Sequence, residues 1–174
     1  MTKHDPSQRL RRSVTAAAKS GRPPNLQVAA LCYRPSGKTF RVLLITSRDT
    51  GRWVTPKGWP MRNRTEPEAA AREAYEEAGI RGDISSRSIG HYTYFKWIDK
   101  NRAIPCVVRV YPLRVREILK SYPETKQRRN KWFRPAKAAR KVQEPELAAL
   151  IRNFDPLTFD VNVNIDPDLA DAAE

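Results

Sequence analysis

The sequence predicts an α+β domain in which a mixed β-sheet lies between helices as an α/β/α sandwich. Two observations lead to this fold class. Apolar strand patterns fall on both sides of one strongly signalled helix, and two further helical patterns follow the last strand. A chain of 174 residues with 40% hydrophobic residues is long enough to bury one such core. Strands and helices in this order favour layers of helix packed on a sheet.

The first half of the chain contains three short strand patterns. Residues 27–34 and 41–47 are apolar and partly β-branched, and a turn at 35–38 separates them. A loop at 48–52 leads to a third strand at 53–55, which runs into Gly58. These strands are expected to enter the sheet before the main helix begins.

The best-signalled helix lies between Thr65 and Gly79. Thr65 is a good N-cap and Glu68 follows three residues later, so the pair predicts a capping box. Pro67 lies in the first turn, where its missing N–H costs nothing. Gly79 can adopt the left-handed conformation that ends a helix. Five alanines strengthen the pattern: Ala69, Ala70, Ala71, Ala74 and Ala78.

After the helix, Gly82 is predicted to break the chain. Residues 88–98 and 103–115 form a hairpin around a turn at 99–102, and Pro105 and Pro112 predict interruptions or edge positions. A polar loop at 117–127 precedes the last strand. That strand, at 130–133, is followed by a short helix at 135–142 and a helix at 145–154 with one apolar stripe.

The net charge of +14 is unevenly distributed. Residues 1–25 carry six Lys or Arg and one acidic residue, while residues 155–174 carry six acidic residues and no Lys or Arg. Residues 26–154 hold 27 Lys or Arg against 12 acidic residues, or +15. We expect a basic flexible arm at 1–25, one domain at 26–154 and an acidic tail at 155–174. The basic field attracts polyanions, such as phosphorylated substrates; the other interpretation is solubility, or weak nonspecific binding of nucleic acid.

The two cysteines, Cys32 and Cys106, lie inside apolar runs without zinc or CxxC spacing. They are expected to be buried and reduced, which favours a cytoplasmic setting. No run approaches the roughly 18 apolar residues of a membrane span. The N-terminus has no apolar core of a signal peptide.

Three glutamates follow one another at helical spacing on the main helix. Glu73 lies three residues before Glu76 and four before Glu77, so their carboxylates can converge on one face. Like charges at these spacings repel, and a divalent cation would reverse the sign of that interaction. Carboxylate oxygens are the ligands that Mg²⁺ prefers, and Mg²⁺ also binds phosphates. The other interpretation of the helix alone is a solvated acidic face.

Together, Gly58 and residues 72–80 decide between these interpretations. They match a Gly, a fixed gap and then Arg-Glu-apolar-x-Glu-Glu-x-Gly-apolar. This pattern resembles the Nudix box, and the resemblance covers about residues 26–154. It implies the α/β/α sandwich of that family, whose members hydrolyse nucleoside diphosphates linked to another group, or related pyrophosphates, with Mg²⁺ or Mn²⁺. One position departs, because Arg64 stands where the box has Glu; Glu66, two residues later, is a candidate substitute.

The resemblance also implies residue roles. Glu73, Glu76 and Glu77 would ligate the metal with help from the backbone carbonyl of Gly58, and Arg72 would orient the carboxylates. These four charged side chains form the expected catalytic set. One of the glutamates, or a residue of a downstream loop, would act as base. Glu124 is the loop candidate, and the other interpretation of Glu124 is a surface acid.

Basic residues near the box are expected to hold phosphates. The loop at 47–53 is similar to that of the diphosphoinositol-polyphosphate and diadenosine-polyphosphate phosphohydrolase branch, where a Ser and the first Arg contact phosphate. Residues 25–27 lack the further basic residues of that branch, which weakens the inositol assignment. A solvated charge is the other interpretation for each basic residue. The expected substrate-binding residues are Ser47, Arg48, Arg52, Lys57, Arg128 and Arg129.

The sequence therefore predicts a Mg²⁺- or Mn²⁺-dependent Nudix pyrophosphohydrolase. Its partner would be a polyphosphorylated small molecule, either a diphosphoinositol polyphosphate or a dinucleoside polyphosphate. Two alternatives stay open: an enzyme that removes pyrophosphate from RNA 5′ ends, and a noncatalytic module that binds a nucleotide or RNA. The intact glutamates argue against the module, and Arg64 is the feature in its favour.

Overall fold

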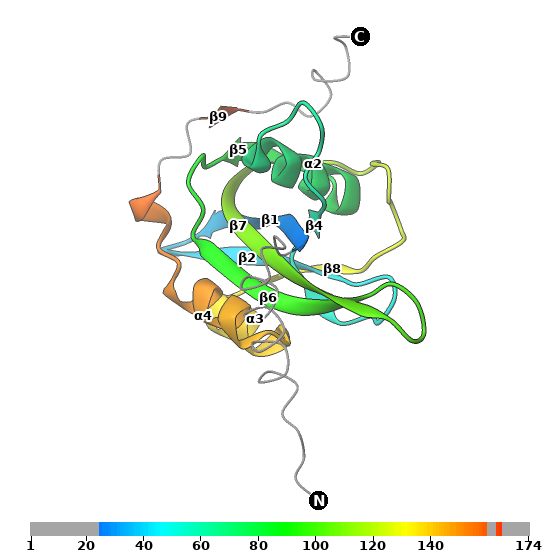
Figure 1. Cartoon of the computed structure of the whole chain (residues 1–174). Helices are drawn as coiled ribbons and strands as arrows, with labels where there is room; N and C mark the ends of the chain where they lie inside the picture. The colour runs from blue at the N-terminus through cyan, green and yellow to red at the C-terminus, as the bar shows by residue number, and fades with distance from the viewer. Residues whose placement is uncertain (1–24, 160–162, 165–174) are drawn as a thin grey trace, which may run out of the picture.

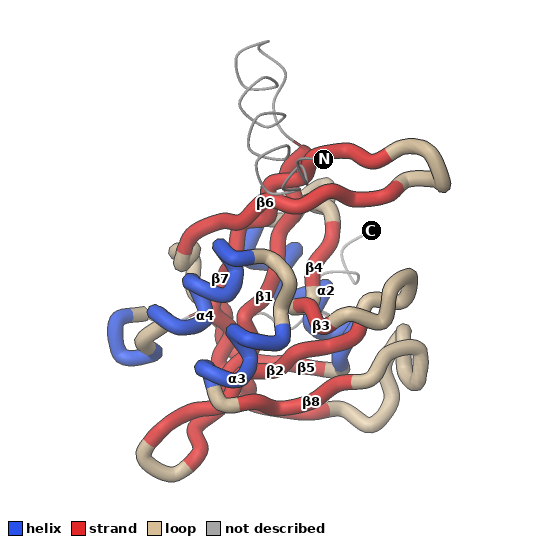
Figure 2. Tube along the Cα trace, turned by 90° about the horizontal axis from the view of Figure 1, so that it is seen from below, coloured by secondary structure: helices blue, strands red, loops and turns tan. Residues whose placement is uncertain are grey.

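The structure is a computed structural model that describes residues 25–159, 163 and 164 of the chain. Within these residues the strands form one mixed sheet in the order β3-β2-β1-β7-β5-β9. β4 also pairs with β1, β6 with β7 and β8 with β2. Helix α2 covers one face of the sheet, while α3 and α4 cover the other (Figures 1 and 2). The predicted α+β sandwich with a mixed sheet is confirmed.

The elements follow the expected order with a few additions. The strands are β1 (Asn25–Ser36), β2 (Thr39–Thr46), β3 (Trp53–Val54), β4 (Lys57–Gly58), β5 (Ile80–Ile84), β6 (Gly90–Trp97), β7 (Ala103–Ile118), β8 (Asn130–Phe133) and β9 (Val163–Asn164). The helices are α2 (Glu66–Ala78), α3 (Pro135–Lys141) and α4 (Pro145–Asn153), followed by a 3₁₀ turn at Pro156–Thr158.

Strand β1 shows why the sheet is buried on both sides. Its side chains alternate between two apolar clusters, with Leu31 in the cluster beneath α3 and α4 and Cys32 in the cluster beneath α2. This period of two is the geometry of a strand. Cys106 belongs to the first cluster, so the two cysteines lie on opposite faces of the sheet, and both are buried and free.

β7 is the longest strand and pairs with three others, which corrects the expectation for its two prolines. Pro105 and Pro112 lie inside the strand and do not interrupt it. Each falls where a neighbouring strand begins or ends. The pairing of β7 with β1 starts at Cys106, one residue after Pro105. Pro112 lies between two other pairings of β7: the one with β6 ends at Val110, and the one with β5 begins at Leu113. A missing N–H is tolerated at such gaps in the ladder.

Helix α2 has the predicted ends. The Thr65 hydroxyl accepts from the Glu68 N–H, and the Glu68 carboxylate accepts from the Thr65 N–H at 2.6 Å, so the capping box is present. Gly79 ends the helix with φ of 66°. A side chain at Gly79 would also overlap the Tyr122 ring, so the loop after β7 packs closely against this turn.

The prediction that Gly82 breaks the chain is wrong, because Gly82 lies within β5. Residues 80–84 pair with β7 through a register shift between Arg81 and Gly82. A Cβ at Gly82 would overlap the carbonyl oxygen of Arg114. Glycine is therefore required here for close approach of two strands, a reason that lies outside the local sequence.

Both ends of the chain fall partly outside the described residues. Of the expected arm at 1–25, only Asn25 is described, and it opens β1. Of the expected tail, Phe159 packs on Phe154 with ring centroids 5.7 Å apart, and β9 pairs with β5. No helix among the described residues is long and apolar enough to cross a membrane.

The contact at Gly82 gives a stability prediction. Gly82→Ala should destabilise the domain by about 1–3 kcal/mol, because backbone atoms must move to admit the methyl group. Chemical unfolding of the purified protein measures this free energy. Thr39→Ala, at an exposed position in β2, is the control and should change it little. An unchanged stability in Gly82→Ala would contradict the close approach of β5 and β7.

Candidate active site

The site forms where the second half of α2 faces β4. Gly58 of β4 lies so close to α2 that a Cβ added to it would overlap the Glu73 carboxylate. The glycine of the motif is therefore required by the contact between strand and helix. This contact places the Gly58 backbone beside the acidic residues, as the resemblance implies.

The three glutamates of α2 have different surroundings. Glu77 is buried; it accepts from Arg128 Nη2 at 2.7 Å and from the Lys57 backbone N–H at 3.2 Å. Glu76 is partly exposed and accepts from Arg72 Nε at 2.6 Å. The expected role of Arg72 as a partner of these carboxylates agrees with this geometry.

Of Glu73 and Glu77, Glu73 has the pKa that is raised further. Burial raises its pKa to about 7, and the neighbouring carboxylates of Glu77, Glu76 and Glu124 add to the shift. The charge of Lys57 opposes it. For Glu77, burial raises the pKa to about 6, with the charge of Arg128 opposing. Burial therefore opposes the ionisation of both carboxylates, and repulsion from neighbouring carboxylates adds to it.

The donor set fits a divalent cation. Four carboxylates crowd one another at this place, and a hard cation with oxygen ligands relieves such repulsion. Within the described residues, however, no three His, Cys, Asp or Glu side chains are already arranged as metal ligands. Glu76 and Glu77 instead point to Arg72 and Arg128. The ligand set of Gly58, Glu73, Glu76 and Glu77 therefore stays a prediction.

The loop before β8 closes the site from the other side. Arg128 lies only 9% exposed, with its Nη1 donating to the Thr46 carbonyl at 3.2 Å. Glu124 is 17% exposed, and it pairs with Arg48 Nη1 at 2.8 Å. The Glu124 backbone N–H donates to the Glu76 carbonyl at 3.0 Å. Glu124 is thus a loop residue whose carboxylate belongs to the acidic cluster, and its role as base stays a prediction.

Of the expected phosphate-binding residues, Arg48, Lys57 and Arg128 lie next to the acidic cluster. Lys57 is partly buried; burial lowers its pKa, and the charge of Glu77 opposes that shift. Its Nζ lies 4.8 Å from the centre of the Tyr94 ring. The Lys57 ammonium thus contacts an aromatic ring, while its charge lowers the pKa values of Glu73 and Glu77.

The other expected phosphate-binding residues have different partners. Arg52 pairs with the buried Glu144 at 2.5 Å. The Arg129 guanidinium lies over the Trp53 ring, 5.6 Å from its centre. The Ser47 backbone N–H donates to the Arg52 carbonyl at 2.8 Å, which closes the loop after β2. Arg52 is nevertheless close to Lys57, because both cations lie over the Tyr94 ring, 5.9 and 4.8 Å from its centre.

Several residues near the site carry no signal in the sequence. Glu144 is buried beside Arg52, and its second carboxylate oxygen has no hydrogen-bond partner among the described residues. Gln27 is buried and accepts from the Tyr94 hydroxyl at 2.6 Å. Glu66, the candidate substitute for the missing box Glu, instead pairs with Arg109 at 2.7 Å and accepts from the Tyr111 hydroxyl. All of these contacts join residues more than 40 positions apart.

A comparison with known protein families shows to which family a chain with this site belongs. A family model for the NUDIX domain matches residues 23–154. The chain belongs to the Nudix family. The Nudix hydrolase 16, mitochondrial, of Arabidopsis thaliana is 36% identical over 123 residues, covering 68% of each chain. The diphosphoinositol polyphosphate phosphohydrolase 3-alpha of Homo sapiens is 32% identical over 120 residues, covering 67% of this chain and 68% of that protein.

Solved structures agree with the fold. The crystal structure of the C. elegans Ap4A hydrolase matches with a TM-score of 0.54 at 22% identity, covering 75% of this chain and 95% of that chain. The family membership makes this Nudix protein a hydrolase of phosphorus-containing acid anhydrides. Nudix hydrolases generally use divalent metals such as Mg²⁺ or Mn²⁺. One relative's name carries the word mitochondrial, and the cytoplasmic setting of this chain stays a prediction.

The raised pKa of Glu73 predicts a pH-dependent stability of the metal-free protein. Its folded-state pKa of about 7 lies above the ordinary value of 4.5, so folding favours the protonated carboxyl. The stabilisation that the protonated Glu73 carboxyl contributes is fully present below pH 4.5 and is lost as the pH rises to about 7. Glu73→Gln should therefore raise the melting temperature at pH 8, and change it little at pH 5. We expect roughly 2–4 °C, which corresponds to about 1 kcal/mol in a domain of this size after allowing for solvent screening.

Thermal unfolding at both pH values, with chelator present, tests this expectation. Glu117→Gln, an exposed glutamate of β7, is the matched control and should have no such pH dependence. Equal effects of Glu73→Gln at pH 5 and pH 8 would show that the Glu73 carboxylate is not crowded.

Proposed function

We propose that this Nudix hydrolase is a Mg²⁺- or Mn²⁺-dependent pyrophosphohydrolase that cleaves a phosphoanhydride bond in a polyphosphorylated small molecule. The candidate substrates are diphosphoinositol polyphosphates and dinucleoside polyphosphates. The observation that carries the proposal is the crowding of Glu73 by three other carboxylates, directly beside basic residues of two loops. An acidic cluster next to cations suits a metal ion that faces a phosphate chain.

The Gly58 carbonyl and the carboxylates of Glu73, Glu76 and Glu77 would hold the ion. When bound, such an ion activates water and neutralises charge on the phosphates. Arg72 holds the Glu76 carboxylate in place through its 2.6 Å hydrogen bond. A glutamate of the cluster, or Glu124, would accept the proton of the attacking water.

The phosphates beyond the scissile bond would contact Arg48, Lys57 and Arg128. Arg128 is largely buried and Lys57 is partly buried, so their charges are less screened than those of surface residues. Arg48 is more exposed and lies at the outer side of the cluster. Relatives named as diphosphoinositol polyphosphate phosphohydrolases and a fold neighbour named as an Ap4A hydrolase support a polyphosphorylated substrate.

The first functional prediction concerns the glutamates. With Mg²⁺, the wild type should hydrolyse a diphosphoinositol polyphosphate or a dinucleoside polyphosphate. Glu76→Gln should reduce kcat by at least about 100-fold, since residues that only support metal ligands already cost 10–100-fold. Its melting temperature should change little, because Glu76 is partly exposed. Glu77→Gln should lose activity and stability together, because it leaves Arg128 buried beside a neutral side chain.

A substrate panel measured for wild type, Glu76→Gln and Glu77→Gln distinguishes the alternatives. Turnover confined to 5′-triphosphorylated RNA would favour removal of pyrophosphate from RNA ends. A wild type that binds but does not hydrolyse any member, and gains turnover in Arg64→Glu, would be a binding module. Near-wild-type activity in Glu76→Gln would refute the assignment of the metal site.

The second functional prediction concerns Arg48. Arg48→Ala should raise KM for a diphosphoinositol or dinucleoside polyphosphate by about fivefold or less, with little change for a short nucleoside diphosphate sugar. An exposed charge contact contributes at most about 1 kcal/mol, and only the longer substrate reaches it. The effect should shrink at high salt because screening already weakens the wild-type contact.

Steady-state kinetics on both substrates at two salt concentrations provide the measurement. Arg102→Ala is the matched control, because Arg102 is an exposed arginine paired with an acid, Asp99, in the hairpin between β6 and β7. Equal losses on long and short substrates would argue for a small nucleotide substrate.

A further inference from the structure

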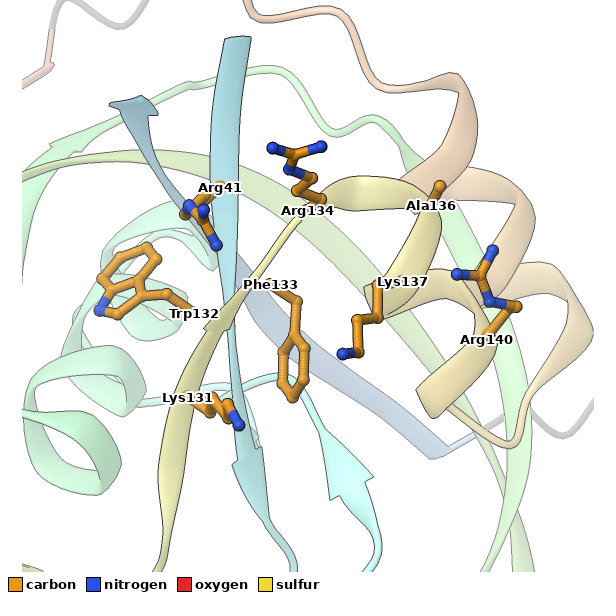
Figure 3. A pocket seen from close by; sticks show the side chains of 8 residues that line it. All are labelled: Arg41, Lys131, Trp132, Phe133, Arg134, Ala136, Lys137 and Arg140. Carbon is orange, nitrogen blue, oxygen red and sulfur yellow. The ribbon is translucent and has the colours of Figure 1, made fainter. Parts of the chain in front are cut away.

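A second basic region surrounds the edge strand β8. A shallow cavity of about 370 Å³ lies there between β2, β8 and the first turns of α3 (Figure 3). Five of its lining residues are basic, and none is acidic. The five are Arg41, Lys131, Arg134, Lys137 and Arg140, and we refer to them as the β8 basic pocket.

The β8 basic pocket is separate from the acidic cluster. Arg41 lies near the start of β2, whereas Ser47 follows the end of that strand. Six residues of strand at roughly 3.3 Å each separate the two positions by about 20 Å. Arg134 and Arg128 are also six residues apart, on either side of β8. One compact ligand in the active site does not reach both places.

The charges of this pocket have no carboxylate partners in the part of the chain that the structure describes. Elsewhere on the domain, arginines pair with acids, as in Arg48 with Glu124 and Arg116 with Asp83. Among the described residues, none of the five pocket side chains forms an ion pair; Arg41 donates only to the Ser36 hydroxyl, at 3.3 Å. Cations placed around one cavity repel one another, and an anion relieves that repulsion.

The aromatic residues of the pocket favour one class of anion. Phe133 is 4% exposed, and its ring packs against Trp53. Trp132 has the Arg34 guanidinium 4.1 Å from its ring centre. Single-stranded nucleic acids depend on open aromatic faces on which bases stack; Phe133 is too buried to offer one, and the Arg34 guanidinium covers one face of Trp132. The pocket therefore recognises charge in a small volume.

We propose that the β8 basic pocket binds a compact polyphosphorylated anion at a site distinct from the catalytic one. The ligand class is a short phosphate chain or a small molecule that carries several phosphates. The cavity volume lies within the range of small-molecule sites. Lys131 and Lys137 project on either side of the Phe133 ring (Figure 3), and the Lys131 Nζ lies 5.8 Å from the centre of that ring.

The test is a site-resolved NMR titration of the full ¹⁵N-labelled chain with tripolyphosphate, in the presence of chelator. Amide signals of residues 131–141 should shift along their own saturation curve, apart from signals of the active-site loops. The triple variant Arg134→Ala, Lys137→Ala, Arg140→Ala should bind tripolyphosphate at this site at least about tenfold more weakly than the wild type. This loss is expected for three exposed charge contacts. All three positions are exposed, and alanine favours the helix at 137 and 140.

The matched control removes three charges at exposed lysines outside the pocket, in Lys38→Ala, Lys100→Ala, Lys120→Ala. Its affinity at residues 131–141 should stay within about twofold of the wild type. An equal loss in the control would show a general charge effect and overturn the proposal. So would the absence of a saturable shift at residues 131–141, or a short oligouridylate binding there more tightly than tripolyphosphate, which would indicate nucleic acid.

Discussion

The buried ion pair between Glu77 and Arg128 holds the parts of the active site together. Glu77 belongs to α2, and its other oxygen accepts from the backbone of Lys57 in β4. Arg128 belongs to the loop before β8 and also donates to the Thr46 carbonyl at the end of β2. Four segments therefore meet at one charged contact. Removing one partner of such a buried pair typically costs about 3–5 kcal/mol, because the remaining charge stays buried.

This ion pair also explains how an acidic cluster is stable before any cation binds. Burial and neighbouring carboxylates raise the pKa values of Glu73 and Glu77, and Arg128 opposes that shift for Glu77. Arg128 Nε lies 3.5 Å from Glu124, but without hydrogen-bond geometry, and no other described residue accepts from it. Among the described residues, the guanidinium is thus hydrogen-bonded through its two terminal nitrogens, to Thr46 and Glu77.

The sequence was most informative for features that depend on residues close together in the chain. The ends of α2 depend on Thr65, Glu68 and Gly79, which are neighbours in the chain, and all three have the predicted roles. β5 was missed because Gly82 looks like a breaker when considered alone. Only the close approach of β7 explains the glycine. In the site, the sequence placed Glu73 and Gly58 together, since a fixed motif joins them. It could not show that Arg52 pairs with Glu144, because that contact spans 92 residues.

The two basic regions differ in what a bound phosphate must displace. In the active site, Arg48 and Arg128 already have carboxylate partners, so a phosphate gains only the difference between its own contact and the one it replaces. A substrate with one or two phosphates gains little from such an exchange, whereas a longer chain contacts several cations at once. In the β8 basic pocket no described carboxylate has to be displaced, and the full charge attracts an anion from solution. If phosphates bind as proposed, the paired cations of the active site would favour highly charged substrates, whereas the cations of the β8 basic pocket would capture an anion directly.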